Sequence, residues 1–271
     1  MGEPMCRNLA RKSGRGVVAW DPRQEPLDRL AADGVAAARS LEEVAGKAEI
    51  VFLSLPGETE IRKVGKGLQG NTVVDCSTAP VALARELSQQ FEFADAPVAR
   101  TRQAAIDGTL SIMVGASDAL FARIEPLLRC MASDVTHCGP PGAGQAVKLL
   151  NNLVLSMTVM ALAEALAVAK ASGAVDPRVL FETLMKGSAD SFALRNHGMK
   201  ALLPELHPEK AFPVTYMMKD VGYALELARS AGFELLGAGS VMELLSETKQ
   251  LGLGEAYHTA IIEAVRKRRT P

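Results

Sequence analysis

Lys148 and Asn152 lie four residues apart at the start of a strongly apolar stretch, Gly139–Gly173. In a helix, positions i and i+4 project from the same face, so the amino group and the amide would point toward one place. Burying a lone ammonium costs free energy unless it has a partner or a chemical task. We therefore predict chemistry at the first turns of this helix. The alternative is a surface lysine whose stem lies along apolar neighbours while its head stays in water.

The helix that positions these two residues is predicted from Gln145 to Ser172, where Gly and Pro are absent. That length corresponds to about seven turns. Beyond its first turns it consists mostly of Leu, Val, Met and Ala, and a helix that is apolar on every side is typically buried on every side. Its most apolar segment, 153–169, contains Glu164 and is shorter than the roughly 20 residues of a membrane span. We expect a core helix.

Upstream of this helix, short β-branched runs alternate with amphipathic stretches, the pattern of a parallel α/β sheet. The expected strands are Gly16–Trp20, Gly34–Ala38, Ile50–Leu55, Thr72–Asp75, Thr109–Gly115 and Asp134–Cys138. The expected helices are Glu3–Lys12, Pro26–Ala32, Leu41–Gly46, Val81–Gln90 and Ala119–Met131, while Phe91–Pro97 leads into an irregular loop.

Downstream of Gly139 no strand pattern recurs. The expected helices there are Asp176–Met185, Val214–Ala231, Ala238–Leu251 and Ala256–Arg268, and residues 186–213, rich in Gly, His and Pro, receive no assignment. This change of pattern predicts two domains, an α/β domain over residues 1–142 and an all-helical domain over residues 143–271.

Composition excludes several classes of partner. The chain has 271 residues with 30 Lys and Arg against 31 Asp and Glu, so it has no general attraction to nucleic acid or anionic membranes. Aromatic residues make up 4%, too few for platforms that stack on single strands. The basic run Arg266–Arg269 is expected to be a solvated helix end.

The cysteines and histidines indicate neither a metal site nor a disulfide framework. Their spacing gives no C-x-x-C and no H-E-x-x-H, so no metal is expected. Four scattered cysteines in a chain of this size favour reduced thiols. The first residues lack the apolar segment of a signal peptide, and we expect a cytoplasmic protein.

Residues that follow strands are candidates for a ligand crevice, because ligands in open α/β sheets bind beyond the carboxyl ends of the strands. Leu55-Pro56 and Thr78 follow two expected strands, with a helix N-cap as the alternative role of Thr78. Asp21 follows another, where it would accept a ribose 2′-hydroxyl or serve only as a turn residue. Arg23 would instead suit a 2′-phosphate. Gly2 could be the third glycine of a dinucleotide-binding turn, which lets helix and sheet pack closely.

Further motifs occur in order along the whole chain. They are Asp95–Val98, Gly108–Gly115, Gly142–Gly144 followed by Lys148 and Asn152, Met218–Val221 and Gly252–Gly254. Together they resemble the β-hydroxyacid dehydrogenases, the relatives of 3-hydroxyisobutyrate dehydrogenase and tartronate semialdehyde reductase. The resemblance implies a Rossmann-like NAD(P)-binding domain followed by an all-α domain that is entered by a long central helix.

The same resemblance implies an oxidoreductase that uses NAD or NADP to interconvert a small β-hydroxyacid and its semialdehyde or keto form. Lys148 would be the general acid/base, and burial at the mouth of the helix would lower its pKa toward the working pH. Asn152 would hold the substrate and Lys148 in register, and Lys219 would close over the cofactor. The implied cofactor-binding residues are Gly2, Asp21, Arg23, Leu55, Pro56, Thr78 and Lys219.

The chain departs from the family in the segment that holds the substrate. Asp-Ala-Pro-Val is usually followed by Ser-Gly-Gly, whereas this chain has Ala99-Arg100-Thr101-Arg102. We expect Ala99, Arg100, Thr101 and Asn152 to contact the substrate. Arg100 or Arg102 would pair with a carboxylate, sulfonate or phosphate, or point into solvent. A smaller departure is Tyr257-His258, where the family commonly has an acidic residue.

A second departure precedes Gly2. The family's opening strand and the first two glycines of its dinucleotide turn are not found there, a difference of about ten residues. We expect a gap in the sheet flanked by unpaired backbone and weak binding of NAD(P), as a start codon at an internal Met or a natural truncation would produce.

Two other functions stay open at this point. The first is an imine-reductase type of activity, against which Lys148 argues. The second is an oligomerisation or binding module without effective cofactor binding. In every case the apolar helices of the second domain predict a homodimer or homotetramer, and the expected ligand is a small acidic molecule.

Overall fold

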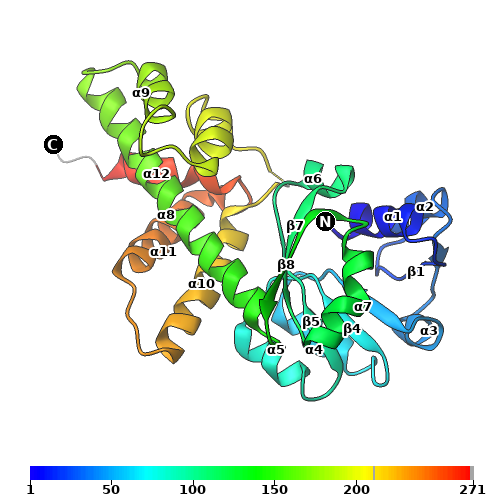
Figure 1. Cartoon of the computed structure of the whole chain (residues 1–271). Helices are drawn as coiled ribbons and strands as arrows, with labels where there is room; N and C mark the ends of the chain where they lie inside the picture. Colours follow the sequence, from blue (N-terminus) through cyan, green and yellow to red (C-terminus); the bar gives the residue numbers. More distant parts are fainter. Residues whose placement is uncertain (210, 269–271) are drawn as a thin grey trace. The chain divides into compact units, whose positions relative to one another are not determined.

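The computed structural model describes residues 1–209 and 211–268. The chain divides into two compact units, Met1–Lys148 and Leu149–Pro271. The first contains a sheet with helices and the second is built from helices (Figure 1). The predicted fold class, an α/β domain followed by an all-α domain, is confirmed. Arg269, the last residue of the basic run, lies outside the described residues.

A six-stranded sheet forms the centre of the first unit. Its strands are β3 (Ile50–Leu53), β4 (Thr72–Asp75), β5 (Glu92–Asp95), β6 (Val98–Ala99), β7 (Leu110–Gly115) and β8 (Ala132–Gly139). The order is β3-β4-β5-β7-β6, with β8 paired to β7. The first three strands are parallel, and Leu53, Asp75 and Asp95 stand level with one another. The carboxyl ends of β3, β4 and β5 therefore lie at one edge of the sheet.

A separate two-stranded sheet pairs β1 (Val18–Ala19) with β2 (Ala36–Ala37) in parallel. Within the described residues, β1 pairs with no other strand and β3 pairs with β4 alone. The edge of β3 that faces away from β4 thus has no ladder partner there. This is the gap flanked by unpaired backbone that the sequence predicted.

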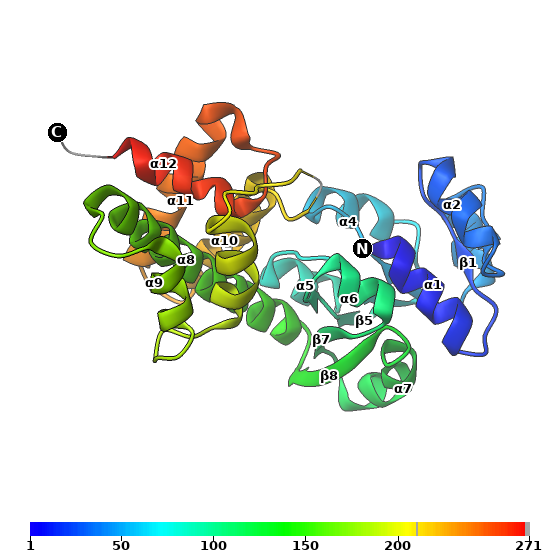
Figure 2. The same ribbon diagram turned by 90° about the horizontal axis from the view of Figure 1, so that it is seen from above.

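Seven helices of the first unit have bounds that lie wholly within it. They are α1 (Gly2–Lys12), α2 (Gln24–Ala31), α3 (Leu41–Lys47), α4 (Glu58–Gly65), α5 (Val81–Leu87), α6 (Arg102–Asp107) and α7 (Asp118–Leu128). Helix α1 lies against α6 (Figure 2), where Nδ2 of Asn8 donates to the carbonyl of Ala105 at 2.8 Å. The irregular loop expected after Phe91 was wrong, because strand β5 begins at Glu92 and α6 follows β6.

Both faces of the larger sheet are buried. Val73 and Phe93 belong to an apolar cluster with residues of α3, α4 and α5, such as Ile61. Their neighbours Val74 and Ala94 belong to a second cluster with residues of α1, α6 and α7. Successive residues of a strand face opposite sides, so helices on both faces explain why these strands read as continuous apolar runs.

The helical unit continues along α8 (Ala143–Ser172), which begins in the first unit. Its other elements are α9 (Pro177–Leu184), the π-helix η1 (Leu194–Leu202), α10 (Val214–Ser230), α11 (Leu236–Thr248), η2 (Lys249–Leu253), η3 (His258–Ala260) and α12 (Ile261–Lys267). The segment 186–213, which received no assignment from the sequence, thus contains η1.

The expectation that α8 is buried on every side was wrong. Leu149 and Leu166 are fully buried, but Val154 and Val168 are 65% and 67% exposed. Val147, Leu150, Val154, Met157 and Val168 form an exposed apolar stripe. The helix is apolar on two faces, and the core of the unit covers one of them. Sequence periodicity cannot separate a covered apolar face from an uncovered one.

Helix α8 also has the length and composition of a membrane span. Its mean hydropathy reaches 1.8 over a window of which 44% is buried, and no other described helix meets both criteria. Core helices of globular proteins meet them equally well. The composition of α8 therefore gives no separate indication of a membrane.

Three of the four histidines gather in the helical unit. Nδ1 of His197 lies 2.7 Å from the hydroxyl of Tyr257, and the rings of His197 and His258 are 4.9 Å apart between centroids. His258 is buried, with Nδ1 at 3.2 Å from the carbonyl of Phe212 and no hydrogen-bond partner for Nε2 among the described residues. Burial lowers the pKa of His197 to about 4 and that of His258 to about 3.

This cluster predicts a loss of stability in acid. Both histidines stay neutral in the folded protein but take up protons on unfolding below pH about 6.5, so their contribution is complete above that pH and declines toward pH 4 and below. Between pH 7 and 5 we expect a loss of roughly 2 kcal/mol per histidine. Urea unfolding of the wild type and of His197→Gln at both pH values measures this loss in the free energy of unfolding.

Comparing the wild type with His197→Gln cancels the contribution of every titratable group that both proteins contain. The variant should lose roughly 2 kcal/mol less than the wild type between pH 7 and 5. His137→Gln, a change in the α/β unit, serves as the control. Equal losses in the wild type and in His197→Gln would show that His197 is not held neutral.

Candidate functional site

The loops that follow β3 and β4 meet at the carboxyl edge of the sheet. The backbone N–H of Leu55 donates to Oγ of Ser77 at 2.9 Å, and the N–H of Ser77 donates to Oδ1 of Asp75 at 2.9 Å. Leu55-Pro56 and Thr78 thus lie on joined loops, and their contact with a cofactor stays a prediction. The N-cap alternative for Thr78 was wrong, because the N-cap position of α5 is Pro80.

Gly2 begins α1 in close contact with the end of β3. A Cβ atom on Gly2 would lie 3.2 Å from both Cβ and Oγ of Ser54. Only a residue without a side chain allows this helix to approach so closely without displacing its neighbour. That packing role is the one expected of the third glycine in a dinucleotide turn. The close approach of Gly2 to Ser54 is therefore the feature of this sheet edge that fits a bound dinucleotide.

Asp21 and Arg23 bind each other. Oδ1 of Asp21 accepts from the backbone N–H of Arg23 at 2.9 Å and from its Nε at 3.2 Å. Asp21 therefore stabilises the turn between β1 and α2. Arg23, in this turn, is the N-cap residue of α2. The acidic and the basic candidate for recognition of the ribose thus form an ion pair with each other.

The amino end of α8 is anchored by Asp95, a fully buried residue at the end of β5. Its Oδ1 accepts from the N–H of Gly142 at 2.6 Å, and its Oδ2 accepts from the N–H of Gln145 at 2.7 Å. A carboxylate that binds the free N–H groups of a helix terminus also opposes the positive end of the helix dipole. Burial nevertheless raises the pKa of Asp95 to about 6.

Gln145 ties the same turn to the loop after β4. It is fully buried, accepts from the N–H of Ala79 at 3.1 Å and donates from Nε2 to the carbonyl of Ser77 at 2.8 Å. The roles of Asp95 and Gln145 were not found from the sequence. The available signal was Gln145 itself, a polar residue between the glycine turn and Lys148 in an otherwise apolar stretch.

Lys148 and Asn152 follow this anchor on one face of α8. Lys148 is half-buried, and Asn152 is 3% exposed. The amide of Asn152 donates from Nδ2 to Oδ2 of Asp220 at 2.6 Å and accepts from Nδ2 of Asn151 at 3.1 Å. The catalytic roles of Lys148 and Asn152 stay predictions.

Lys219 lies on α10 of the helical unit. Its Nζ is 3.4 Å from Oδ1 of Asp220, and it lies 5.8 Å and 5.5 Å from the ring centroids of Tyr216 and Tyr223. The predicted contact of Lys219 with the cofactor stays a prediction.

The segment that departs from the family has a glycine-like backbone. Arg100 has φ of 84°, a conformation that favours glycine, and it stands where the family has the first glycine of Ser-Gly-Gly. Its guanidinium donates to the carbonyl of Thr109 at 2.6 Å, to Oγ of Ser133 at 2.7 Å and to Oδ2 of Asp134 at 2.6 Å. These bonds tie Arg100 to the ends of β7 and β8.

The residues on either side of Arg100 have local roles as well. Ala99 pairs with Ser111 between β6 and β7. The hydroxyl of Thr101 accepts from the N–H of Ala104 and caps α6. Arg102 is exposed. Contact of these residues with a substrate stays a prediction.

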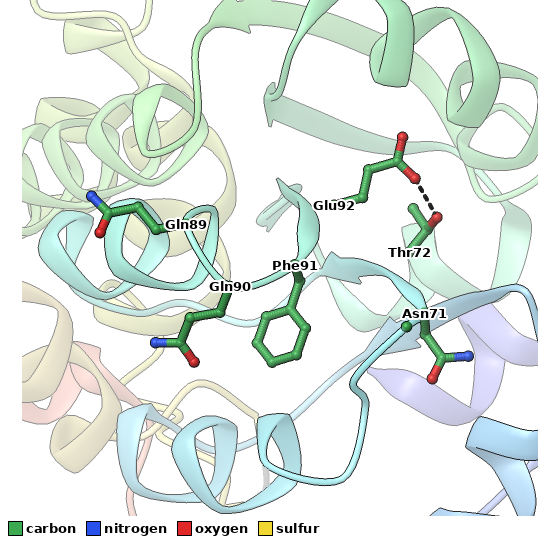
Figure 3. A pocket seen from close by; sticks show the side chains of 7 residues that line it. Asn71, Thr72, Gln89, Gln90, Phe91 and Glu92 are labelled. Atoms are coloured by element: carbon green, nitrogen blue, oxygen red, sulfur yellow. Dashed lines mark hydrogen bonds between the residues drawn. The ribbon is translucent and has the colours of Figure 1, made fainter.

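A hollow of about 360 Å³ lies elsewhere on the first unit (Figure 3). It is lined by Gly70, Asn71, Thr72, Gln89, Gln90, Phe91 and Glu92. Thr72 and Glu92 are the first residues of β4 and β5, and the Thr72 hydroxyl donates to Oε2 of Glu92 at 2.6 Å. The hollow is at the amino ends of these strands, opposite to the edge where ligands of such sheets bind.

No group of three or more His, Cys, Asp or Glu side chains among the described residues is arranged to hold a metal ion.

Comparison with known proteins identifies the family. Residues 1–139 match the model of the NAD binding domain of 6-phosphogluconate dehydrogenase, and residues 142–265 match that described as NAD-binding of NADP-dependent 3-hydroxyisobutyrate dehydrogenase. The chain belongs to the β-hydroxyacid dehydrogenase family. It is an NAD(P)-dependent hydroxyacid dehydrogenase, as the motifs predicted.

Individual members of this family are similar over almost their whole length. The 2-(hydroxymethyl)glutarate dehydrogenase of Eubacterium barkeri is 31% identical over 97% of this chain and 91% of its own. The 2-hydroxy-3-oxopropionate reductase of Escherichia coli (strain K12) is 32% identical over 98% and 94%. The solved 3-hydroxyisobutyrate dehydrogenase of Mycobacterium tuberculosis with L-serine is 28% identical, with a TM-score of 0.88 over 98% and 96%.

Proposed function

We propose that this dehydrogenase interconverts a small β-hydroxyacid and its semialdehyde, with Lys148 as the general acid/base. The observation that carries the proposal is the anchored amino end of α8, where Asp95 and Gln145 fix the turn that precedes Lys148 and Asn152. When bound, NAD(P) accepts or supplies the hydride at the carbon that bears oxygen. In oxidation, Nζ of Lys148 takes the hydroxyl proton, and in reduction it returns that proton to the same oxygen.

The substrate class is supported by the relatives. 2-(Hydroxymethyl)glutarate, 2-hydroxy-3-oxopropionate and L-serine all carry oxygen on the carbon β to a carboxylate. For this chain we propose that Asn152 orients the reacting oxygen and that Arg102 attracts the carboxylate. Leu55, Pro56, Thr78 and Gly2 would receive the dinucleotide at the carboxyl edge of the sheet, and Lys219 would complete its binding.

The proposal is tested by binding and turnover on the same protein. Titration with NADH and NADPH, followed by fluorescence, gives the two affinities, and oxidation of either cofactor is then measured with a panel of β-semialdehydes. We expect turnover with at least one of them and none with cyclic imines. Reduction of the imines alone would indicate imine-reductase chemistry. Absence of binding of either cofactor would favour the oligomerisation or binding module.

We further propose that the chain forms a homodimer or homotetramer through the exposed apolar stripe of α8. Val147, Leu150, Val154 and Met157 recur at alternating intervals of three and four residues, the spacing of a helix–helix seam. A contiguous exposed apolar surface of this kind is typical of protein interfaces.

Val154→Glu is expected to dissociate the oligomer, because it would bury a charge in the seam. Analytical ultracentrifugation measures the mass, and Lys186→Glu, a change at an exposed position outside the stripe, is the control. A wild-type chain that is monomeric at tens of micromolar, or a Val154→Glu variant with the wild-type mass, would refute this interface.

We also propose a domain boundary at residues 142/143 and a cytoplasmic location. Gly142 stands directly before α8 with φ of 93°, a conformation that suits a turn between domains. Cys6, Cys76, Cys130 and Cys138 are all free thiols, which supports a reducing compartment.

A further inference from the structure

Asp220 is a buried carboxylate on α10 of the helical unit, next to Lys219 in the chain. The residue is 2% exposed. Its Oδ2 accepts the 2.6 Å hydrogen bond from Asn152, whereas its Oδ1 has no hydrogen-bond partner among the described residues. Nζ of Lys219 lies 3.4 Å from Oδ1. A carboxylate buried with so few hydrogen bonds costs free energy, and packing alone does not explain its presence.

The chemistry of this carboxylate determines which way the amide of Asn152 faces. An ionised carboxylate only accepts hydrogen bonds, so it must meet the NH₂ side of that amide. The amide oxygen of Asn152 then faces the other way, where it accepts from Asn151 at 3.1 Å. An amide at position 220 would lack this selectivity, because it can meet either end of Asn152.

The same carboxylate also contacts the ammonium of Lys219. Its Oδ1 lies 3.4 Å from Nζ of Lys219, the preceding residue of α10. The rings of Tyr216 and Tyr223, at 5.8 Å and 5.5 Å from Nζ, flank it there. Asp220 therefore contacts both Asn152 of α8 and Lys219 of α10.

We propose that Asp220 is a positioning residue of the hydroxyacid dehydrogenase. Its carboxylate orients the amide of Asn152 and holds the ammonium of Lys219 in place. The inference rests on the proposed function, in which Asn152 orients the reacting oxygen. It adds a residue that acts through Asn152 and Lys219 and does not itself touch the substrate.

A double-mutant cycle of Asp220→Asn and Asn152→Ala tests the proposal at 25 °C. Asp220→Asn keeps the shape of the side chain and should lower kcat about tenfold or more. In the Asn152→Ala background the same change should lower kcat by clearly less than in the wild-type background, because the amide that Asp220 orients is gone and only its contact with Lys219 is then lost. Glu226→Gln, a change of an exposed glutamate on the same helix, should leave kcat unchanged. Losses that multiply in the double variant would overturn the proposal.

Thermal unfolding of the same variants provides a measurement that does not need turnover. Each single change should lower Tm by roughly 5 °C, and the double variant should fall by little more than the larger single loss. If the wild type turns over no β-semialdehyde, the proposed function fails, and this thermal cycle still decides whether Asp220 and Asn152 act together. Additive losses of Tm would overturn their coupling whatever the activity.

Discussion

Lys148→Ala is expected to lower kcat by about 10²–10⁴-fold, the range that a positioned general acid/base contributes. The loss should fall on kcat, because the amino group acts on the proton that moves in the transition state. The affinity for NADH or NADPH should change by less than about twofold, because the lysine is assigned to the substrate oxygen. Steady-state kinetics and cofactor titration of the same preparation measure both quantities.

Lys170→Ala is the matched control, at the far end of the same helix. Lys170 is an exposed residue in a surface ion pair with Glu205, so its removal should leave kcat unchanged. A Lys148→Ala variant that keeps wild-type kcat would remove Lys148 from its role. A variant that loses cofactor affinity in proportion to kcat would assign Lys148 to the cofactor.

Gly144→Ala is expected to destabilise the protein by about 3 kcal/mol or more, because a buried side chain would be inserted without room for it. The added Cβ would lie 2.4 Å from the carbonyl oxygen of Met113 and 2.9 Å from the carbonyl oxygen of Asp95. Both are backbone atoms of the sheet, so neither can swing aside as a flexible side chain would. Urea unfolding gives the free energy.

Gly46→Ala is the matched control, since it is also a glycine in a helix. Nothing lies within 4 Å of a Cβ at Gly46, and alanine is the better helix former there. This change should be neutral or stabilise by up to about 1 kcal/mol. Equal stability of Gly144→Ala and the wild type would show that α8 does not start in contact with the sheet as described.

The sequence predicted the fold wherever local pattern and tertiary position agree. Thr72–Asp75 is a β-branched run between turn residues, and β4 has those bounds. The long helix was expected because Gly and Pro are absent from Gln145 to Ser172, and α8 covers that range. The family motifs indicated the activity class and cofactor, which the comparisons confirm.

Other features depend on contacts between distant residues and leave no local signal. Strand β5 was missed because a four-residue strand with two acidic residues has no clear alternation. The exposed stripe of α8 has the same composition as its buried face. The bond between Asn152 and Asp220 joins positions that are 68 residues apart. Each of these features is specified by packing, which one sequence does not display.

The most direct test of the account is the rescue of Lys148→Ala by primary amines. Because the proposed task of Lys148 is the transfer of one proton, small amines that enter the space left by its side chain should restore turnover in proportion to their concentration. The restored rate should also depend on the pKa of the amine. Restoration with that dependence is the predicted result. A variant that turns over as fast as the wild type without added amine would contradict the account.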